Sequence, residues 1–267
     1  MTDFSQSLNT LTSIEELVDG QTIIHRLHPG VKLALTFLYL VLVVSCPVYN
    51  PGLLAVFAFF PFILMALAEI PWRPLFKRVA IALPFVAFAG IANLIFDRQV
   101  VAVIGFLPIT TGGLSFLTIL LKTCFCVTAV LILIATTGLP AIAYQLLRIH
   151  IPRILVEQIL LIYRYISVLL GEAARMTTAY HLRAPQERGI RMKDMGVFLG
   201  QLLLRSFDRA DRVYHAMKCR GYDGSFLQGR PAPANAADYA VFFLGAGALL
   251  LMRFFPFLWT QVFLPLF

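Results

Sequence analysis

The sequence predicts an all-α integral membrane protein with about five transmembrane helices, arranged as four plus one, and a cytoplasmic helical domain before the last. Three observations predict this fold class. Hydrophobic side chains make up 59% of the 267 residues and charged ones only 13%, against about 45–50% and about 25% in soluble proteins. Several apolar stretches approach the roughly 20 residues that cross a bilayer as a helix. A long arginine-rich segment separates the last stretch from the others.

Four predicted spans lie in the first half of the chain, at residues 33–49, 52–68, 79–96 and 113–137. Pro47 and Pro51 break the turn between the first two, which predicts an antiparallel hairpin. The apolar stretch 100–108 is too short to cross, and we interpret it as an interfacial or re-entrant piece. With a last span at 239–259, the predicted domains are 1–32 (N-terminal segment), 33–138 (membrane domain), 139–236 (helical domain) and 237–267 (final span and C-terminus).

The basic residues set the predicted orientation, because short cytoplasmic loops retain lysine and arginine. The connection 69–78 carries Arg73, Lys77 and Arg78, whereas the first connection carries none and the third only Arg98. Residues 139–236 hold 14 of the 22 basic residues but only 7 of the 14 acidic ones. We therefore predict a multi-pass protein of the cell inner membrane, with a cytoplasmic N-terminus and helical domain. The net charge of +8 reflects this orientation and not a nucleic-acid surface.

The helical domain contains two amphipathic helices, at 154–182 and 192–219. Pro185 ends the first helix, and Gly221 and Gly224 end the second. The stretch 154–170 is apolar enough for a sixth span, but Arg164 would then lie in mid-bilayer at a cost of about 2.5–3.5 kcal/mol. We assign the stretch to the cytoplasmic domain and keep the sixth span as the alternative.

Enzyme and metal-site motifs are absent from the sequence. No phosphate-binding loop, catalytic motif or pair of intramembrane carboxylates is present, and the four cysteines and five histidines lack ligand spacing. We predict no catalytic residue, no metal site and no cofactor. Lys122 is the one ionisable residue well inside a span. The alternative function is therefore a self-sufficient secondary transporter or channel that uses Lys122 and the region of Asp97 and Arg98.

Two clusters that contain arginine and glycine stand where the two amphipathic helices end, at 181–189 and 216–224. Cations and glycine are usual at helix C-termini, so each cluster alone fits a structural role. An arginine flanked by small residues can also enter a tight acidic groove of a partner. Two such clusters suggest two such grooves.

The second cluster resembles a known signature. Cys219-Arg220-Gly221 resembles the second Ala-Arg-Gly signature of the transmembrane T components of energy-coupling-factor (ECF) importers, and Leu182-Arg183-Ala184 stands where the first would fall. The stretches HRLHPGVKL (25–33) and GQLLLRSFDRADRVYHAMKCRGYDG (200–224) resemble the CbiQ branch, which is associated with cobalt uptake. Leu182 and Cys219 occupy positions where alanine is usual.

This resemblance implies a non-catalytic coupling subunit that transmits movements of two ATPases to a substrate-binding membrane subunit. Arg183 and Arg220 would sit in the ATPase grooves, with Arg188 as the alternative first-signature arginine. The implied coupling set is then Arg183, Ala184, Arg188, Cys219, Arg220 and Gly221. The implied partners are two CbiO-like ATPases, a CbiM-like substrate-binding subunit, a small CbiN-like subunit and the lipid bilayer, without nucleic acid. The sequence leaves cobalt and nickel open.

Overall fold

The computed structural model describes residues 20, 22–47, 51–96, 100–104, 107–187, 189–222 and 235–263. These residues form two compact units. We call the first the membrane unit; it contains α2 (Ile23–Arg26) to α7, the strands β1 and β2, and α11 (Ala236–Phe263). The second, the α8–α10 unit, contains α8 (Leu139–Arg148), α9 (Arg153–Arg183) and α10 (Met192–Cys219).

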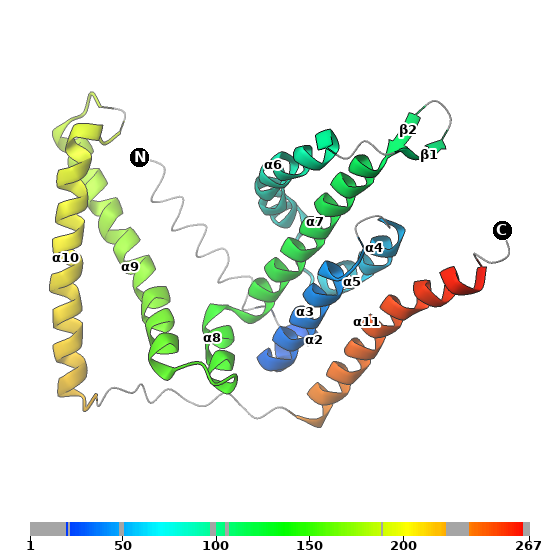
Figure 1. Ribbon diagram of the computed structural model, residues 1–267. Coiled ribbons are helices and arrows are strands. Elements are labelled where there is room, and N and C mark those ends of the chain that lie inside the picture. The colour runs from blue at the N-terminus through cyan, green and yellow to red at the C-terminus, as the bar shows by residue number, and fades with distance from the viewer. Residues whose placement is uncertain are drawn as a thin grey trace. The chain divides into compact units, whose positions relative to one another are not determined.

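Helix α7 (Thr111–Thr137) is the centre of the membrane unit. It packs against α3 (Pro29–Val44), α4 (Pro51–Phe57), α5 (Phe59–Leu67) and α6 (Trp72–Phe96), while α11 lies along α3 and α4 (Figure 1). A buried cluster joins four of these helices through Tyr39, Val43, Cys46, Leu54, Phe57, Ala129 and Leu249. A second cluster links the start of α6 to α7 through Ala68, Ile70, Leu75, Ile132 and Ala135.

The predicted second span, 52–68, is not one continuous helix. It is divided into α4 and α5 at Ala58. The physical reason is Pro61, which has no backbone N–H with which to bond the Phe57 carbonyl one turn earlier. The Tyr39 hydroxyl donates to that carbonyl instead, at 3.0 Å. A buried tyrosine on α3 therefore satisfies the backbone group that the proline leaves open.

The third predicted span also needs correction at its start. Helix α6 begins at Trp72, seven residues before the predicted 79, so Arg73, Lys77 and Arg78 lie on its first two turns and not in a loop. Pro74 is compatible with this start because the first turn has no intrahelical N–H bonds to lose. The stretch predicted as an interfacial or re-entrant piece forms a two-stranded antiparallel hairpin, β1 (Val100–Ile104) and β2 (Leu107–Thr110), on an otherwise helical chain.

Three helices among the described residues are long and apolar enough to cross a membrane: Thr111–Thr137, Arg153–Arg183 and Ala236–Phe254. Shorter apolar helices cover Pro29–Val44 and Leu54–Leu67. The composition and helices are those of an all-α, multi-pass membrane protein, as predicted. Because α9 meets the same length and composition criterion, it preserves the sixth-span alternative for 154–170.

Three helix ends meet at one end of the membrane unit, around the HRLHPGVKL stretch (25–33). The carboxylate of Asp238 accepts from the backbone N–H of Asn235 at 2.8 Å and from that of His28 at 3.1 Å, so it serves the N-termini of both α11 and α3. The buried ammonium of Lys32 donates to the Thr136 carbonyl at the C-terminus of α7, at 2.7 Å. Each charge has the sign that its helix end favours.

Lys122 has a structural partner set within the membrane unit. Its ammonium donates to the carbonyl of Val44, the last residue of α3, at 3.0 Å, and to that of Cys46, just past the helix, at 2.5 Å. Arg253 of α11 donates to the Ser45 carbonyl between them, at 3.3 Å. The two cations satisfy carbonyls that the end of α3 leaves without helical partners. Asp97 and Arg98 lie outside the described residues.

Candidate functional site

The candidate site lies on two long helices that the chain joins by a short turn. Helix α9 has 31 residues and α10 has 28, close to the two predicted helices. They run antiparallel from the turn at 184–191, and Figure 1 shows them closest there. A ten-residue helix that the sequence analysis did not predict, α8, precedes them. The sequence signal for this helix was available, because apolar residues recur there at helical spacing: Ile142, Ala143, Leu146 and Leu147.

The first signature, Leu182-Arg183-Ala184, is the last turn of α9. The Ala184 N–H still bonds the Tyr180 carbonyl at 2.9 Å, but Pro185 has no N–H and ends the helix. Pro185 then begins a tight turn that closes with the Glu187 N–H on the Ala184 carbonyl, at 3.1 Å. Leu182 is 77% exposed and Arg183 is exposed beside it.

The second signature, Cys219-Arg220-Gly221, ends α10 in a different way. The Tyr222 N–H bonds the Met217 carbonyl and the Gly221 N–H bonds the Lys218 carbonyl, both at 3.0 Å. This pair of bonds is a Schellman motif, whose turning residue has a positive φ. Gly221 has φ of +80°, where a side chain would be strained. Cys219 and Arg220 are exposed, and Cys219 is a free thiol.

The signature arginines lack the ion pairs that four of the seven other described arginines of α9, α10 and the turn make; Arg164, Arg209 and Arg212 lack them too. The side chains of Arg183 and Arg220 make no hydrogen bond or ion pair with another described residue. By contrast, the carboxylates of α9, the turn and the start of α10 are bound by other cations: Glu157 by Arg153, Glu172 by Arg175 and Arg205, and Glu187 and Asp194 by Arg191. The described structure thus leaves both signature guanidinium groups exposed.

A polar cluster that the sequence analysis missed holds the turn between the helices. The Tyr180 hydroxyl donates to Asp194 at 2.7 Å, and the Arg191 guanidinium contacts the same carboxylate oxygen at 3.3 Å. The hydrogen bond from Tyr180 is the largest influence and lowers the pKa of Asp194 below its ordinary 3.8. Desolvation opposes this shift, and the hydrogen bond from Arg191 adds to it. Asp194 in the first turn of α10 was the signal, since acids favour helix N-termini.

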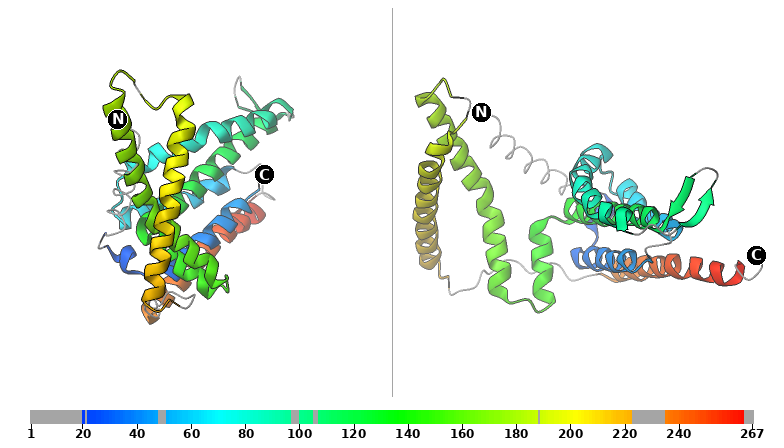
Figure 2. Two further views of the ribbon diagram at one scale, coloured as in Figure 1. Left: turned by 90° about the vertical axis from the view of Figure 1, so that its left-hand side faces the viewer. Right: turned by 45° about the horizontal axis from the view of Figure 1, so that its top comes forward.

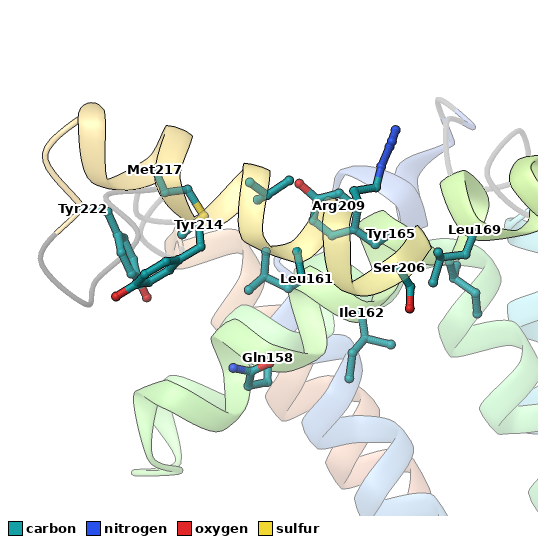
Figure 3. A pocket seen from close by; sticks show the side chains of 13 residues that line it. Gln158, Leu161, Ile162, Tyr165, Leu169, Ser206, Arg209, Tyr214, Met217 and Tyr222 are labelled. Atoms are coloured by element: carbon teal, nitrogen blue, oxygen red, sulfur yellow. The ribbon is translucent and has the colours of Figure 1, made fainter. Parts of the chain in front are cut away.

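An apolar groove separates the two helices away from the turn (Figure 3). It has a volume of about 510 Å³. Side chains of α9 and α10 and Tyr222, just past the second signature, line it; those labelled in Figure 3 include Leu161, Ile162, Tyr165, Tyr214, Met217 and Tyr222. The second signature therefore adjoins a groove, whereas the first adjoins the polar turn.

The described structure does not bring the two signatures together. Arg183 and Arg220 lie near opposite ends of α10, which at 1.5 Å per residue spans about 42 Å. Figure 2 shows the same separation of the two helix ends in other directions of view. Arg188, the alternative first-signature arginine, lies outside the described residues. The arrangement presents two distant cationic ends on one helical pair.

A metal site was not predicted, and no group of three or more His, Cys, Asp or Glu side chains within the described ranges could hold an ion. The cysteines of the membrane unit are Cys46, Cys124 and Cys126. They lie on or just past apolar helices, with Cys46 buried and the other two partly buried.

Comparison with known proteins points to one family. The family model for CbiQ, described as cobalt transport protein, matches residues 20–231. The chain is 28% identical over 232 residues to the energy-coupling factor transporter transmembrane protein EcfT of Streptococcus equi, covering 78% of this chain and 82% of that protein. It is 28% identical over 228 residues to the EcfT of Ruminiclostridium cellulolyticum, covering 80% of this chain and 84% of that protein. Cobalt transport protein CbiQ of Rhodobacter capsulatus is 35% identical over 105 residues, 38% of this chain and 42% of that protein.

Proposed function

Because the chain belongs to the CbiQ family of ECF transporter T components, we propose that it couples two cytoplasmic ATPases to a separate substrate-binding membrane subunit. One observation carries this proposal: two helices joined by a turn end in two exposed arginines whose side chains bond no other described residue. The T component contributes no catalysis of its own, and its ATPase partners hydrolyse ATP.

Arginine suits the proposed contact for physical reasons. A guanidinium offers five donors in a planar fork, which binds paired acceptors in an acidic groove better than a lysine does. The two ends lie about 42 Å apart along α10, so they fit two separate grooves and not one. We propose Arg183, flanked by Ala184, for one ATPase and Arg220, flanked by Cys219 and Gly221, for the other. Arg188 remains the alternative to Arg183.

The substrate-binding subunit would cover apolar side chains that the α8–α10 unit leaves exposed. Leu182, Met192 and Val197 are all at least 70% exposed, and the groove beside Tyr222 is apolar. Exposed apolar surface, where it is contiguous, is typical of interaction sites. We propose a CbiM-like subunit as the occupant, with a small CbiN-like subunit as a further member of the complex.

Cobalt is the proposed cargo. The family description and the Rhodobacter relative both name cobalt transport, which supports cobalt over nickel. The described residues of this chain hold no cluster that could select a metal. We therefore assign metal selection to the substrate-binding subunit.

The proposed orientation follows the basic residues. The N-terminus, the start of α6 and the α8–α10 unit face the cytoplasm, and the C-terminus faces outward. In this arrangement α9 is a cytoplasmic helix in spite of its length and composition. Its charged residues Arg164, Glu172 and Arg175 support a cytoplasmic position, since each is costly inside a bilayer.

The hydrogen bonds of Lys122 argue against the alternative of a self-sufficient carrier or channel. A transport path needs a polar group that faces it, but the Lys122 ammonium is bonded to two carbonyls at the C-terminal end of α3. We propose a structural role for this lysine, as the cap of a helix that ends beside α7.

Co-purification from the native membrane tests the proposed function. The tagged full chain should bring down two ATP-binding subunits and a substrate-binding membrane subunit, identified by mass spectrometry. The double variant R183A/R220A should reach the membrane in equal amount and lose the ATPases while it retains the membrane partner. R164A/R212A is the matched control, because both arginines are exposed on the same two helices away from the signatures. Loss of ATPases from both variants, or from neither, would contradict the proposal.

A further inference from the structure

We propose that the membrane unit binds an anionic phospholipid of the cytoplasmic leaflet, with an acyl chain in the groove between α5, α6 and α7 and the phosphate on Lys77 and Arg78. The proposal is independent of ATPase coupling. It rests on the proposed orientation, which places the start of α6 at the cytoplasmic surface of the membrane.

The groove is the first observation. It has a volume of about 310 Å³ and an almost wholly apolar lining from three helices, including Phe62, Met65, Phe76, Ala80, Phe125 and Thr128. Its size lies at the lower end of the range of about 300–1,000 Å³ for ligand pockets. In a bilayer, the molecule available to fill an apolar groove on the outside of a helix bundle is an acyl chain.

The charge beside the groove is the second observation. Because α6 begins at Trp72, its basic residues stand on the same helix as the groove lining. At 100° per residue, Leu75, Phe76, Val79, Ala80 and Leu83 cover one face of α6, and Arg78 borders that face beside Leu75. Lys77 borders the opposite edge of that face, beside Ala80, so the two cations flank the groove-lining face. Neither Lys77 nor Arg78 makes a hydrogen bond or ion pair with another described residue.

The depth of these cations is the third observation. Trp72 is 58% exposed and packs edge-on against Phe76, with ring centroids 6.2 Å apart. Tryptophan is enriched at the level of lipid headgroups, which places the first turn of α6 there. Side chains on a helix lean toward its N-terminus, so the long Lys77 and Arg78 stems reach back from the groove toward that level. An acyl chain in the groove would then have its phosphate beside both cations.

The net charge favours an anionic headgroup over a zwitterionic one. Residues 69–78 contain Arg73, Lys77 and Arg78 but one acid, Glu69. Each lysine or arginine near an anionic membrane surface contributes about 1 kcal/mol. Two of them correspond to a preference of roughly 30-fold for phosphatidylglycerol over phosphatidylethanolamine.

Native mass spectrometry of the full chain, released from nanodiscs of equal phosphatidylglycerol and phosphatidylethanolamine, tests the headgroup. Wild type should retain one phosphatidylglycerol in preference. K77Q/R78Q should lose that preference by roughly 30-fold. R26Q/R148Q, which removes two exposed cations that do not line the groove, should keep it. Equal retention by wild type and K77Q/R78Q, or equal loss in both double variants, would overturn the proposal.

The proposed position of the acyl chain in the groove is tested separately. Ala80→Phe places a ring in the groove and should weaken retention of both lipids, whereas Ala66→Phe on the exposed side of α5 should not. Phosphatidylglycerol with a photoactivatable diazirine on its acyl chain should crosslink in wild type to peptides of α5, α6 or α7 that line the groove. This measurement needs no variant to fold. Crosslinks confined to other helices would refute the site.

Discussion

Arg183 and Arg220 carry the sharpest prediction at the scale of single residues. Each replacement by alanine should abolish or strongly reduce ATP-driven cobalt uptake while membrane insertion stays normal. Truncating one partner of a buried, hydrogen-bonded charge pair costs roughly 2–5 kcal/mol, much of it from the partner charge left unpaired. A cation that only complements a helix dipole contributes about 1 kcal/mol or less.

Uptake of radioactive cobalt in cells with matched expression measures the difference between these roles. Arg183→Lys and Arg220→Lys should fail almost as badly as alanine if the planar fork binds two acceptors. Arg164→Ala and Arg212→Ala should transport normally, and Arg188→Ala should be milder than Arg183→Ala. Normal uptake by R183A and R220A would show that both signatures are ordinary helix ends with no role in ATPase coupling.

Gly221 carries a second prediction at this scale, because its φ of +80° closes the Schellman motif. Gly221→Ala should destabilise the end of α10 by about 1–2 kcal/mol, the cost of a left-handed conformation for a residue with a Cβ. Open space around the position means that backbone strain, not a clash, is the cause. Gly221→Asn should be milder, because asparagine tolerates this conformation.

Hydrogen exchange of the amides of residues 217–222, in the full chain, measures that effect. Gly200→Ala in the same helix is the control, since its added Cβ also meets no atom within 4 Å while its backbone is helical. It should leave exchange unchanged or slow it. Equal exchange in G221A and G200A would show that the glycine is not needed for the turn.

At the scale of elements, the turn between α9 and α10 depends on the Asp194 cluster. Asp194→Asn removes the charge that Tyr180 and Arg191 share, so amides of residues 184–195 should exchange faster. Asp208→Asn, an exposed acid on the same helix, is the control. Unchanged exchange in D194N would show that the turn is stabilised by Pro185 without the Asp194 cluster.

The same carboxylate gives a pH dependence with a definite sign. Its pKa is lower in the folded chain than the ordinary 3.8, so it stabilises the turn above about pH 4 and this contribution is lost as pH falls through the folded value. Exchange in the turn, corrected for intrinsic rates, should therefore be constant between pH 5 and pH 8. Asp194→Asn should remove the acid-induced loss below pH 4. A loss of protection between pH 5 and pH 7 would point to another group.

The sequence predicted these elements unevenly, and the reasons are physical. The ends of α9 and α10 were predicted to within a residue because Pro185 and Gly221 act locally. The division of the second span at Ala58 was not, since Pro61 is tolerated only because the distant Tyr39 bonds the freed carbonyl. The early start of α6 was missed because charged residues were interpreted as a loop. Long-range contacts such as Tyr180 with Asp194 have no periodic signal in a sequence.

At the scale of the whole molecule, the proposed assignment of roles predicts that the isolated chain binds neither cobalt nor nickel. A carrier would need its own ligands, and the described residues bring no three candidate side chains together. Calorimetry with Co²⁺ and Ni²⁺ on the purified full chain should show no micromolar binding, whereas the complex with its substrate-binding subunit should bind one of them. Stoichiometric binding to the isolated chain would favour the carrier.

Membrane orientation is the remaining prediction for the whole molecule, and Cys219 provides a native probe. Cys219 is exposed and free, so a chain in which Cys46, Cys124 and Cys126 are replaced by alanine presents one thiol beside the second signature. An impermeant maleimide added to intact cells should not label it, and permeabilisation should expose it. The same chain with Cys219→Ala and Thr111→Cys, at the start of α7, should be labelled from outside.

Maleimide labelling of a cysteine at position 164 distinguishes the cytoplasmic assignment of α9 from the sixth-span assignment. As a cytoplasmic helix, α9 should allow a cysteine at position 164 to react after permeabilisation as fast as Cys219 does, because both positions would meet water. A sixth span would instead bury this position in lipid, protect it from maleimide and move Cys219 to the outer face. Labelling of Cys219 in intact cells would therefore overturn the orientation and, with it, the cytoplasmic position that ATPase coupling requires.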